Sequence, residues 1–188
     1  MLRASTQLLS YSVNHARYTI QGEKGGEEKM LRGAKEKIAL YTGYIIIMCI
    51  TLMGYDGMGL YDGCTLWQRI SYPFFHQNVF HAAINLYVFH QCYRAIPCGI
   101  GHMVAFYLIA ISYPSQSSIP IIGLSGFIYA YMGFIAPYVN KKVRYNTIIL
   151  LYISIGIFLP CMAVGVHIYC YVLGLLWGYL NAPLCQDK

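Results

Sequence analysis

Apolar runs that few charged residues interrupt occupy most of the chain between residues 38 and 181. Of the 188 residues, 57% are hydrophobic and only 11% are charged, whereas an ordinary soluble domain carries about 25% charged residues. So few charges cannot cover the surface of a water-soluble body of this size. The sequence therefore predicts an integral membrane protein whose apolar runs are membrane-spanning helices.

A helix that crosses the hydrocarbon core needs roughly 17–25 apolar residues, and several of the runs are near the lower limit. We expect an all-α integral membrane protein built as a six-transmembrane-helix bundle. The predicted spans cover about residues 38–55, 76–93, 99–112, 124–139, 145–159 and 164–181.

Positive charge lies in alternate loops of this predicted bundle. Arg94 and the basic residues at 141–144 share one side with the N-terminal segment, and the opposite side holds Arg69 beside two aspartates. The positive-inside rule then places both termini in the cytoplasm. The predicted segments are a polar cytoplasmic tail (1–37), the six-helix domain (38–182) and a short C-terminal tail (183–188).

The polar segment between the first two runs, residues 56–75, is too polar to span a membrane. Its aromatic content predicts an interfacial loop, with Trp67 and Tyr72 at the depth of the lipid headgroups. The net charge of +6 forms no basic stripe, so we expect no nucleic acid partner. The seven cysteines show neither a CxxC pair nor zinc-ligand spacing, so we expect no metal and no disulfide framework.

One serine stands between two glycines at the start of the fourth run, in Gly123-Leu124-Ser125-Gly126. Pro120 and a polar cluster precede it, which predicts a loop, a tight turn and then a helix with Ser125 in its first turn. Backbone N–H groups there have no intrahelical acceptors and face any negative charge that develops nearby. Ser125 is therefore either a helix cap or a nucleophile.

The spacing of three polar residues bears on this choice. The interval from His81 to Ser125 is 44 residues, and from Ser125 to His167 it is 42. Crossing a core of about 30 Å and returning takes about 40 helical residues. The three residues are therefore predicted to share one depth, near the outer ends of their helices.

His167 stands inside an apolar run, where a histidine faces the bundle interior or water. It is either a packing residue bonded to a neighbouring helix or a general base for Ser125. Tyr129 follows Ser125 by one turn on the same face and could hold the His167 ring, although 19 tyrosines make a structural role equally natural. No acidic residue falls within a run, which favours a Ser–His dyad over a triad.

His81 and Asn85 are four residues apart and share one helix face. They suit an oxyanion hole together with the Ser125 backbone N–H, or else a polar interhelical contact worth about 1 kcal/mol. His76 lies nearer the interface and is expected to order the loop. Glycines predict close packing of the fourth and sixth runs, which a Ser125–His167 hydrogen bond requires: these are Gly126, Gly133, Gly174 and Gly178.

Together these residues resemble the rhomboid family of intramembrane serine proteases. The resemblance rests on Trp67 to His76 followed by His81 and Asn85, on Gly123 to Gly126 with Tyr129, and on Gly165-Val166-His167 with Gly174. Gln68 separates Trp67 from Arg69, where the family usually has them adjacent. Cys170 stands where the family often has glycine.

This resemblance implies a rhomboid-like bundle in which Ser125 is the nucleophile, His167 the base, and His81, Asn85 and the Ser125 amide the oxyanion hole. Tyr129, Gly123, Gly126 and His76 would support them. It implies single-pass membrane proteins as substrates, which enter sideways from the lipid bilayer and are cut near the outer face of the membrane, with no cofactor.

We expect a bacterial inner membrane, because the chain is short and shows no large appended domain. Two other readings stay open. One is a catalytically inactive rhomboid-like protein that binds membrane clients, although such relatives typically lack the serine or the histidine. The other is a channel or carrier, which would place polar residues along a whole path.

Overall fold

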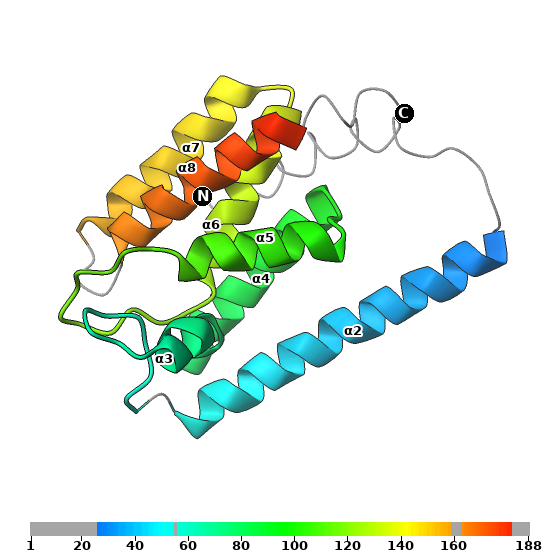
Figure 1. Cartoon of the computed structure of the whole chain (residues 1–188). Helices are drawn as coiled ribbons and strands as arrows, with labels where there is room; N and C mark the ends of the chain where they lie inside the picture. Colours follow the sequence, from blue (N-terminus) through cyan, green and yellow to red (C-terminus); the bar gives the residue numbers. More distant parts are fainter. Residues whose placement is uncertain (1–25, 55, 159–162, 182–188) are drawn as a thin grey trace.

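The computed structural model describes residues 26–54, 56–158 and 163–181 of the chain, and this part is mostly helical (Figure 1). The helices are α2 (Gly26–Met53), α3 (Leu66–Ser71), α4 (Val79–Ala95), α5 (Ile100–Ile111), α6 (Ser125–Ile135), α7 (Lys142–Gly156) and α8 (Val164–Asn181). Two 3-10 turns, η2 (Tyr72–Phe74) and η3 (Ala136–Tyr138), follow α3 and α6.

The prediction of six membrane-spanning helices is wrong. Among the described residues, only α8, with 18 residues and a mean hydropathy of 1.2, is long and apolar enough to cross a membrane. Each of the six runs does form a helix, but α5 has 12 residues and α6 has 11. At 1.5 Å per residue these reach about 18 and 17 Å, well short of a core of about 30 Å.

The helix ends differ from the ends of the predicted runs. The run at 124–139 stops as a regular helix at Ile135, and Pro137 then lies in η3. At the other end of the chain, α2 begins at Gly26, so it crosses the predicted boundary between tail and domain at residue 38. The remainder of that tail (1–25) and the C-terminal tail (183–188) lie outside the described residues.

Helix α6 lies at the centre of the bundle, and most of its side chains are buried. Tyr131 stacks on Phe106 of α5 with ring centroids 4.8 Å apart, and Phe127 meets the same ring edge-on at 5.8 Å. Such aromatic pairs add to the stability gained from burying their apolar area. The serine at the start of α6 is therefore carried on the best-packed helix of the described structure.

Glycines bring α6 and α8 into backbone contact, as the sequence predicts. A Cβ atom built on Gly174 would lie 2.0 Å from the Ala130 carbonyl oxygen, and one on Gly178 would lie 2.6 Å from that of Phe134. On the facing helix, a Cβ on Gly133 would lie 2.2 Å from the Tyr171 carbonyl oxygen. No side chain fits at these positions, so the two backbones can approach only because they are glycines.

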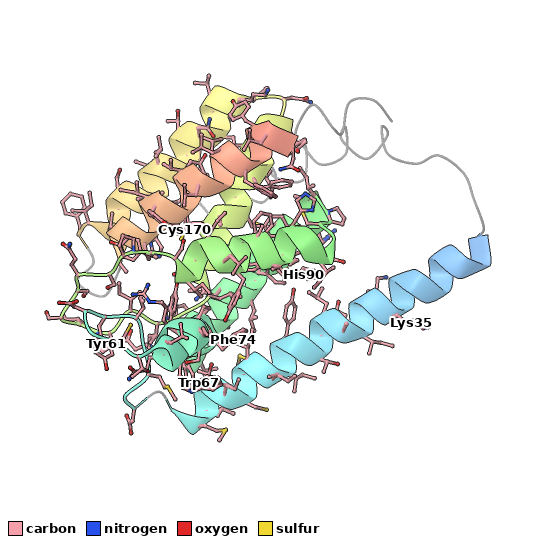
Figure 2. All side chains as sticks on the ribbon, in the orientation of Figure 1. Lys35, Tyr61, Trp67, Phe74, His90 and Cys170 are labelled. Carbon is pink, nitrogen blue, oxygen red and sulfur yellow. The ribbon has the colours of Figure 1, made fainter. Side chains whose placement is uncertain are left out.

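Helix α2 runs antiparallel to α4 and contacts the bundle with its C-terminal half. The Tyr44 hydroxyl and His90 Nδ1 are 3.2 Å apart, and Ile47 is buried in the same contact region. The N-terminal half of α2 extends away from the other helices (Figure 1). Figure 2 labels His90 on the side of the bundle that faces α2.

The segment predicted to float at the membrane surface is instead a packed loop. Leu60 and Ile121 form an antiparallel bridge with N–H···O distances of 2.8 and 3.0 Å, which ties this loop to the one before α6. Tyr72 is 1% exposed, and its hydroxyl donates to the Ala110 carbonyl at 2.9 Å. Its predicted place among headgroups is therefore wrong, whereas Trp67 is 67% exposed.

Gln68, which separates Trp67 from Arg69, has a structural role of its own. Gln68 completes a capping box with Thr65 at the start of α3, so both backbone N–H groups of the box are satisfied. Arg69 then donates from one guanidinium nitrogen to the carbonyls of Ile111 and Tyr113, at 3.1 and 2.8 Å. The first of these carbonyls is at the end of α5, where a helix lacks its own donors, and the second lies just beyond that helix.

Candidate active site

Ser125 is the first residue of α6, and its side chain does not cap the helix. The cap position is Leu124, which makes no side-chain capping bond. The Ser125 hydroxyl oxygen instead lies 2.9 Å from Nε2 of His167 on α8. The structure therefore shows no capping by Ser125, and the hydroxyl lies within hydrogen-bond distance of a histidine nitrogen.

His167 is 3% exposed, because α8 packs tightly on α6. Its ring stacks on Tyr129 with centroids 4.4 Å apart and an angle of 28° between the planes. Nδ1 of His167 is buried and has no hydrogen-bond partner in the described part of the chain. A serine proton can pass to Nε2 only when the ring hydrogen is on Nδ1, and the Tyr129 stack fixes the plane of that ring.

His81 and Asn85 both border Gly123, two residues before the serine. Gly123 has a φ of +116°, a left-handed conformation that favours glycine. A Cβ atom there would lie 3.0 Å from Cε1 and 3.2 Å from Nε2 of His81, and 3.4 Å from Nδ2 of Asn85. The backbone and both side chains therefore come together next to Ser125.

Asn85 supplies a donor that has no acceptor. Its side chain is 6% exposed, and Nδ2 has no partner within the described residues. Buried donors are normally paired, so an orphan next to a serine is a place where an added negative charge would be stabilised. The first N–H groups of α6, including that of Ser125, point to the same end of the helix.

His76 holds the backbone just before the serine. It is 1% exposed, and its Nε2 accepts the Leu124 N–H at 3.3 Å. Its ring meets that of His81 edge-on, with centroids 5.2 Å apart. Burial, and secondarily the neighbouring His81, lower the pKa of His76 from 6.5 to about 4. His76 is therefore neutral at pH 7 and free to accept this bond.

Tyr72 is a site neighbour that the sequence did not reveal. Its carbonyl accepts the Gly123 N–H at 3.1 Å. Its hydroxyl would lie 3.1 Å from a Cβ atom on Gly126, and Cys170 Sγ would lie 3.4 Å from the same atom. A side chain at position 126 would therefore press on the Tyr72 hydroxyl of η2 and contact α8. Segment 56–75 has no periodicity that would have indicated a buried tyrosine.

The site residues named from the sequence therefore gather at one end of α6. His90 and His102 lie elsewhere, against Tyr44 and Phe134. Within the described residues, no group of three or more His, Cys, Asp or Glu side chains could hold a metal ion. Comparisons with protein-family models and with curated proteins find no match to this chain.

Proposed function

We propose that the chain is a membrane-located serine endopeptidase in which Ser125 is the nucleophile and His167 the general base. The observation that carries the proposal is the 2.9 Å contact between the Ser125 hydroxyl and His167 Nε2 at the start of a buried helix. The resemblance of the surrounding motifs to the rhomboid family supports it. An inactive client-binding protein would need no such contact, so the enzyme is the favoured reading.

In the proposed reaction, His167 Nε2 takes the Ser125 proton as the serine oxygen attacks a peptide carbonyl carbon. The oxygen of the tetrahedral intermediate lies against the Ser125 N–H, Asn85 Nδ2 and His81. His167 then gives the proton to the leaving amine, and the acyl-enzyme forms. Water attacks this ester with His167 again as base, which releases the second product and restores the serine.

The proposed substrates are single-pass membrane proteins, which reach the site sideways from the lipid bilayer. One helix of the described structure could cross a membrane, and several others expose large apolar side chains, such as Phe80 at 75%, Ile100 at 81% and Leu151 at 59%. Large apolar side chains exposed on several helices suit a surface that contacts lipid or other proteins.

The depth of the site sets where a substrate would be cut. Ser125, His81 and His167 lie toward the ends of their helices that meet the packed loops, so cleavage is expected near one face of the membrane. We place that face on the outer side of a bacterial inner membrane. A helical peptide bond is shielded by its own hydrogen bonds, so the cut segment must unwind. The resemblance to the rhomboid family implies a small residue at the cut.

The test is cleavage of a reporter protein with one transmembrane segment, in detergent and in liposomes. Ser125→Ala and His167→Ala are each expected to reduce cleavage by at least about 10³-fold. Ser154→Ala is the matched control, because Ser154 lies on α7 and its hydroxyl donates to the Leu150 carbonyl of the same helix. Cleavage by the Ser125 variant at the rate of the unmodified protein would overturn the proposal.

A further inference from the structure

We propose that the end of the bundle opposite Ser125 binds anionic phospholipid headgroups. We call this surface the basic face, and its described side chains are Lys35, Lys37, Arg94, Lys141, Lys142 and Arg144. All of them are exposed. The inference rests on the membrane location in the proposed function, but not on the catalytic residues.

The pairing of α2 with α4 brings the first of these charges together. Tyr44 and His90 are in contact at 3.2 Å in this antiparallel pair. Arg94 lies one helical turn beyond His90, and Lys37 lies about two turns before Tyr44. These cations are therefore at the same end of the molecule, and Figure 2 shows Lys35 on the part of α2 that extends beyond the bundle.

The charges of α7 reach the same end through α6. The Tyr131 hydroxyl donates to the carbonyl of Ile96, just past the end of α4. Two turns later, the Tyr138 hydroxyl donates to the Gly178 carbonyl near the end of α8, at 3.4 Å. The basic residues 141–144 follow directly, and Figure 1 shows α7 beginning beside the end of α8.

The two ends of the molecule differ in charge. No ion pair joins a cation of the basic face to a carboxylate among the described side chains, and Glu36 is the one acidic residue between its lysines in the sequence. At the Ser125 end the described charges are Asp56, Asp62 and Arg69, and the Arg69 guanidinium is bonded to two carbonyls. The exposed positive potential is thus concentrated on the basic face.

Apolar side chains stand directly beside these cations, which favours a lipid over a soluble anion. Ile38 follows Lys37 and is 66% exposed, and Val143 lies between Lys142 and Arg144 and is 81% exposed. Alternating cationic and apolar side chains match the boundary between headgroups and acyl chains, where lysine and arginine extend toward the phosphate. An anionic phospholipid supplies both parts of this ligand.

The chain carries its own reporters for a test. It holds two tryptophans, Trp67 and Trp177. Trp177 is 37% exposed on α8 and adjoins Gly178, which contacts Tyr138 of η3. Trp67 is 67% exposed on α3 at the opposite end, as Figure 2 shows. Trp67→Phe therefore leaves a reporter beside the basic face, and Trp177→Phe leaves one at the Ser125 end.

Each single-tryptophan protein is reconstituted in phosphatidylcholine vesicles that contain brominated phosphatidylglycerol or brominated phosphatidylcholine as the quencher. We expect several-fold stronger binding of phosphatidylglycerol than of phosphatidylcholine at Trp177, and no preference at Trp67. The triple variant Lys141→Gln/Lys142→Gln/Arg144→Gln should lower the ratio of phosphatidylglycerol to phosphatidylcholine quenching at Trp177 to about 1. High salt should weaken this preference in the parent protein. The charge-conserving variant Lys141→Arg/Lys142→Arg should keep the preference.

Equal quenching of Trp177 by both brominated lipids in the parent protein would overturn the inference and leave the membrane location intact. Quenching by neither lipid would overturn the inference and the membrane location together. Reporter cleavage is measured on the same preparations, so a failure of the proposed peptidase activity is seen separately.

Discussion

At the scale of single residues, the site depends on how firmly the His167 ring is held. Nδ1 of His167 has no hydrogen-bond partner among the described residues, and the His167 ring stacks on Tyr129, which fixes the plane of the ring. In a triad a carboxylate does this work by bonding Nδ1. In the dyad that we propose, the Tyr129 ring takes the place of that carboxylate, and we propose Tyr129 as a positioning residue.

Replacing Tyr129 by alanine should therefore lower kcat by about 10- to 100-fold, since a misplaced base costs rate without removing the chemistry. Tyr129→Phe keeps the ring and should retain most of the activity. The measurement is reporter cleavage by both variants, with the thermal midpoint as a check on folding. Equal losses in the two variants would show that the hydroxyl, and not the stacked ring, is what matters.

His76 makes the stability of the loop before Ser125 sensitive to pH. Its pKa is lowered from 6.5 to about 4 in the folded protein, so the unfolded chain takes up the proton first. The contribution of neutral His76 to the free energy of unfolding is complete above pH 6.5. It is lost as the pH falls toward 4, and the loss is at most about 3 kcal/mol. Thermal unfolding between pH 7.5 and pH 4 should show this loss, and His76→Gln should flatten the profile.

At the scale of elements, the contact between α6 and α8 positions the dyad. Both residues of the dyad are on these two helices, and glycines set the distance between the backbones. The tight loop at Gly123 adds the other half of the site, because it borders His81 and Asn85 of α4. The site is thus assembled from three helices and one loop rather than from a single motif.

Gly174→Ala tests this contact, because the added Cβ would lie 2.0 Å from the Ala130 carbonyl oxygen. The helices must separate, which should cost about 1–3 kcal/mol or more and remove most of the activity. Gly101→Ala on α5 is the matched control, since a Cβ there has nothing within 4 Å. Stability and cleavage are measured for both, and an active, stable Gly174→Ala protein would contradict this account.

At the scale of the whole molecule, turn residues and the spacing of polar residues predicted the fold better than the lengths of the apolar runs did. Pro120 and Gly123 correctly indicated a loop and turn before a helix that begins at Ser125. The 42-residue interval also predicted that Ser125 and His167 lie at the same end of the bundle, and the two side chains are in contact. Alternate helices of an up-and-down arrangement return to the same end even when they are too short to cross a membrane. The span count failed because hydropathy does not show where a helix ends, as η3 and Pro137 demonstrate.

Tyr72 shows what the sequence could not provide. An aromatic residue in a short polar segment is as compatible with a membrane interface as with a core, and only the long-range bond to Ala110 decides between them. The pairing of Leu60 with Ile121 likewise could not be predicted from the sequence, because it is an isolated bridge between two residues and no strand pattern surrounds it. Contacts between loops far apart in the chain leave no periodic signal.

The most direct test of the central claim is covalent labelling of the protein in lipid vesicles with a fluorophosphonate probe, followed by mass spectrometry of its peptides. The account predicts an adduct on Ser125 that disappears in Ser125→Ala and is strongly reduced in His167→Ala. An adduct that forms on another residue, or labelling of Ser125 that is unchanged when His167 is replaced, would contradict it.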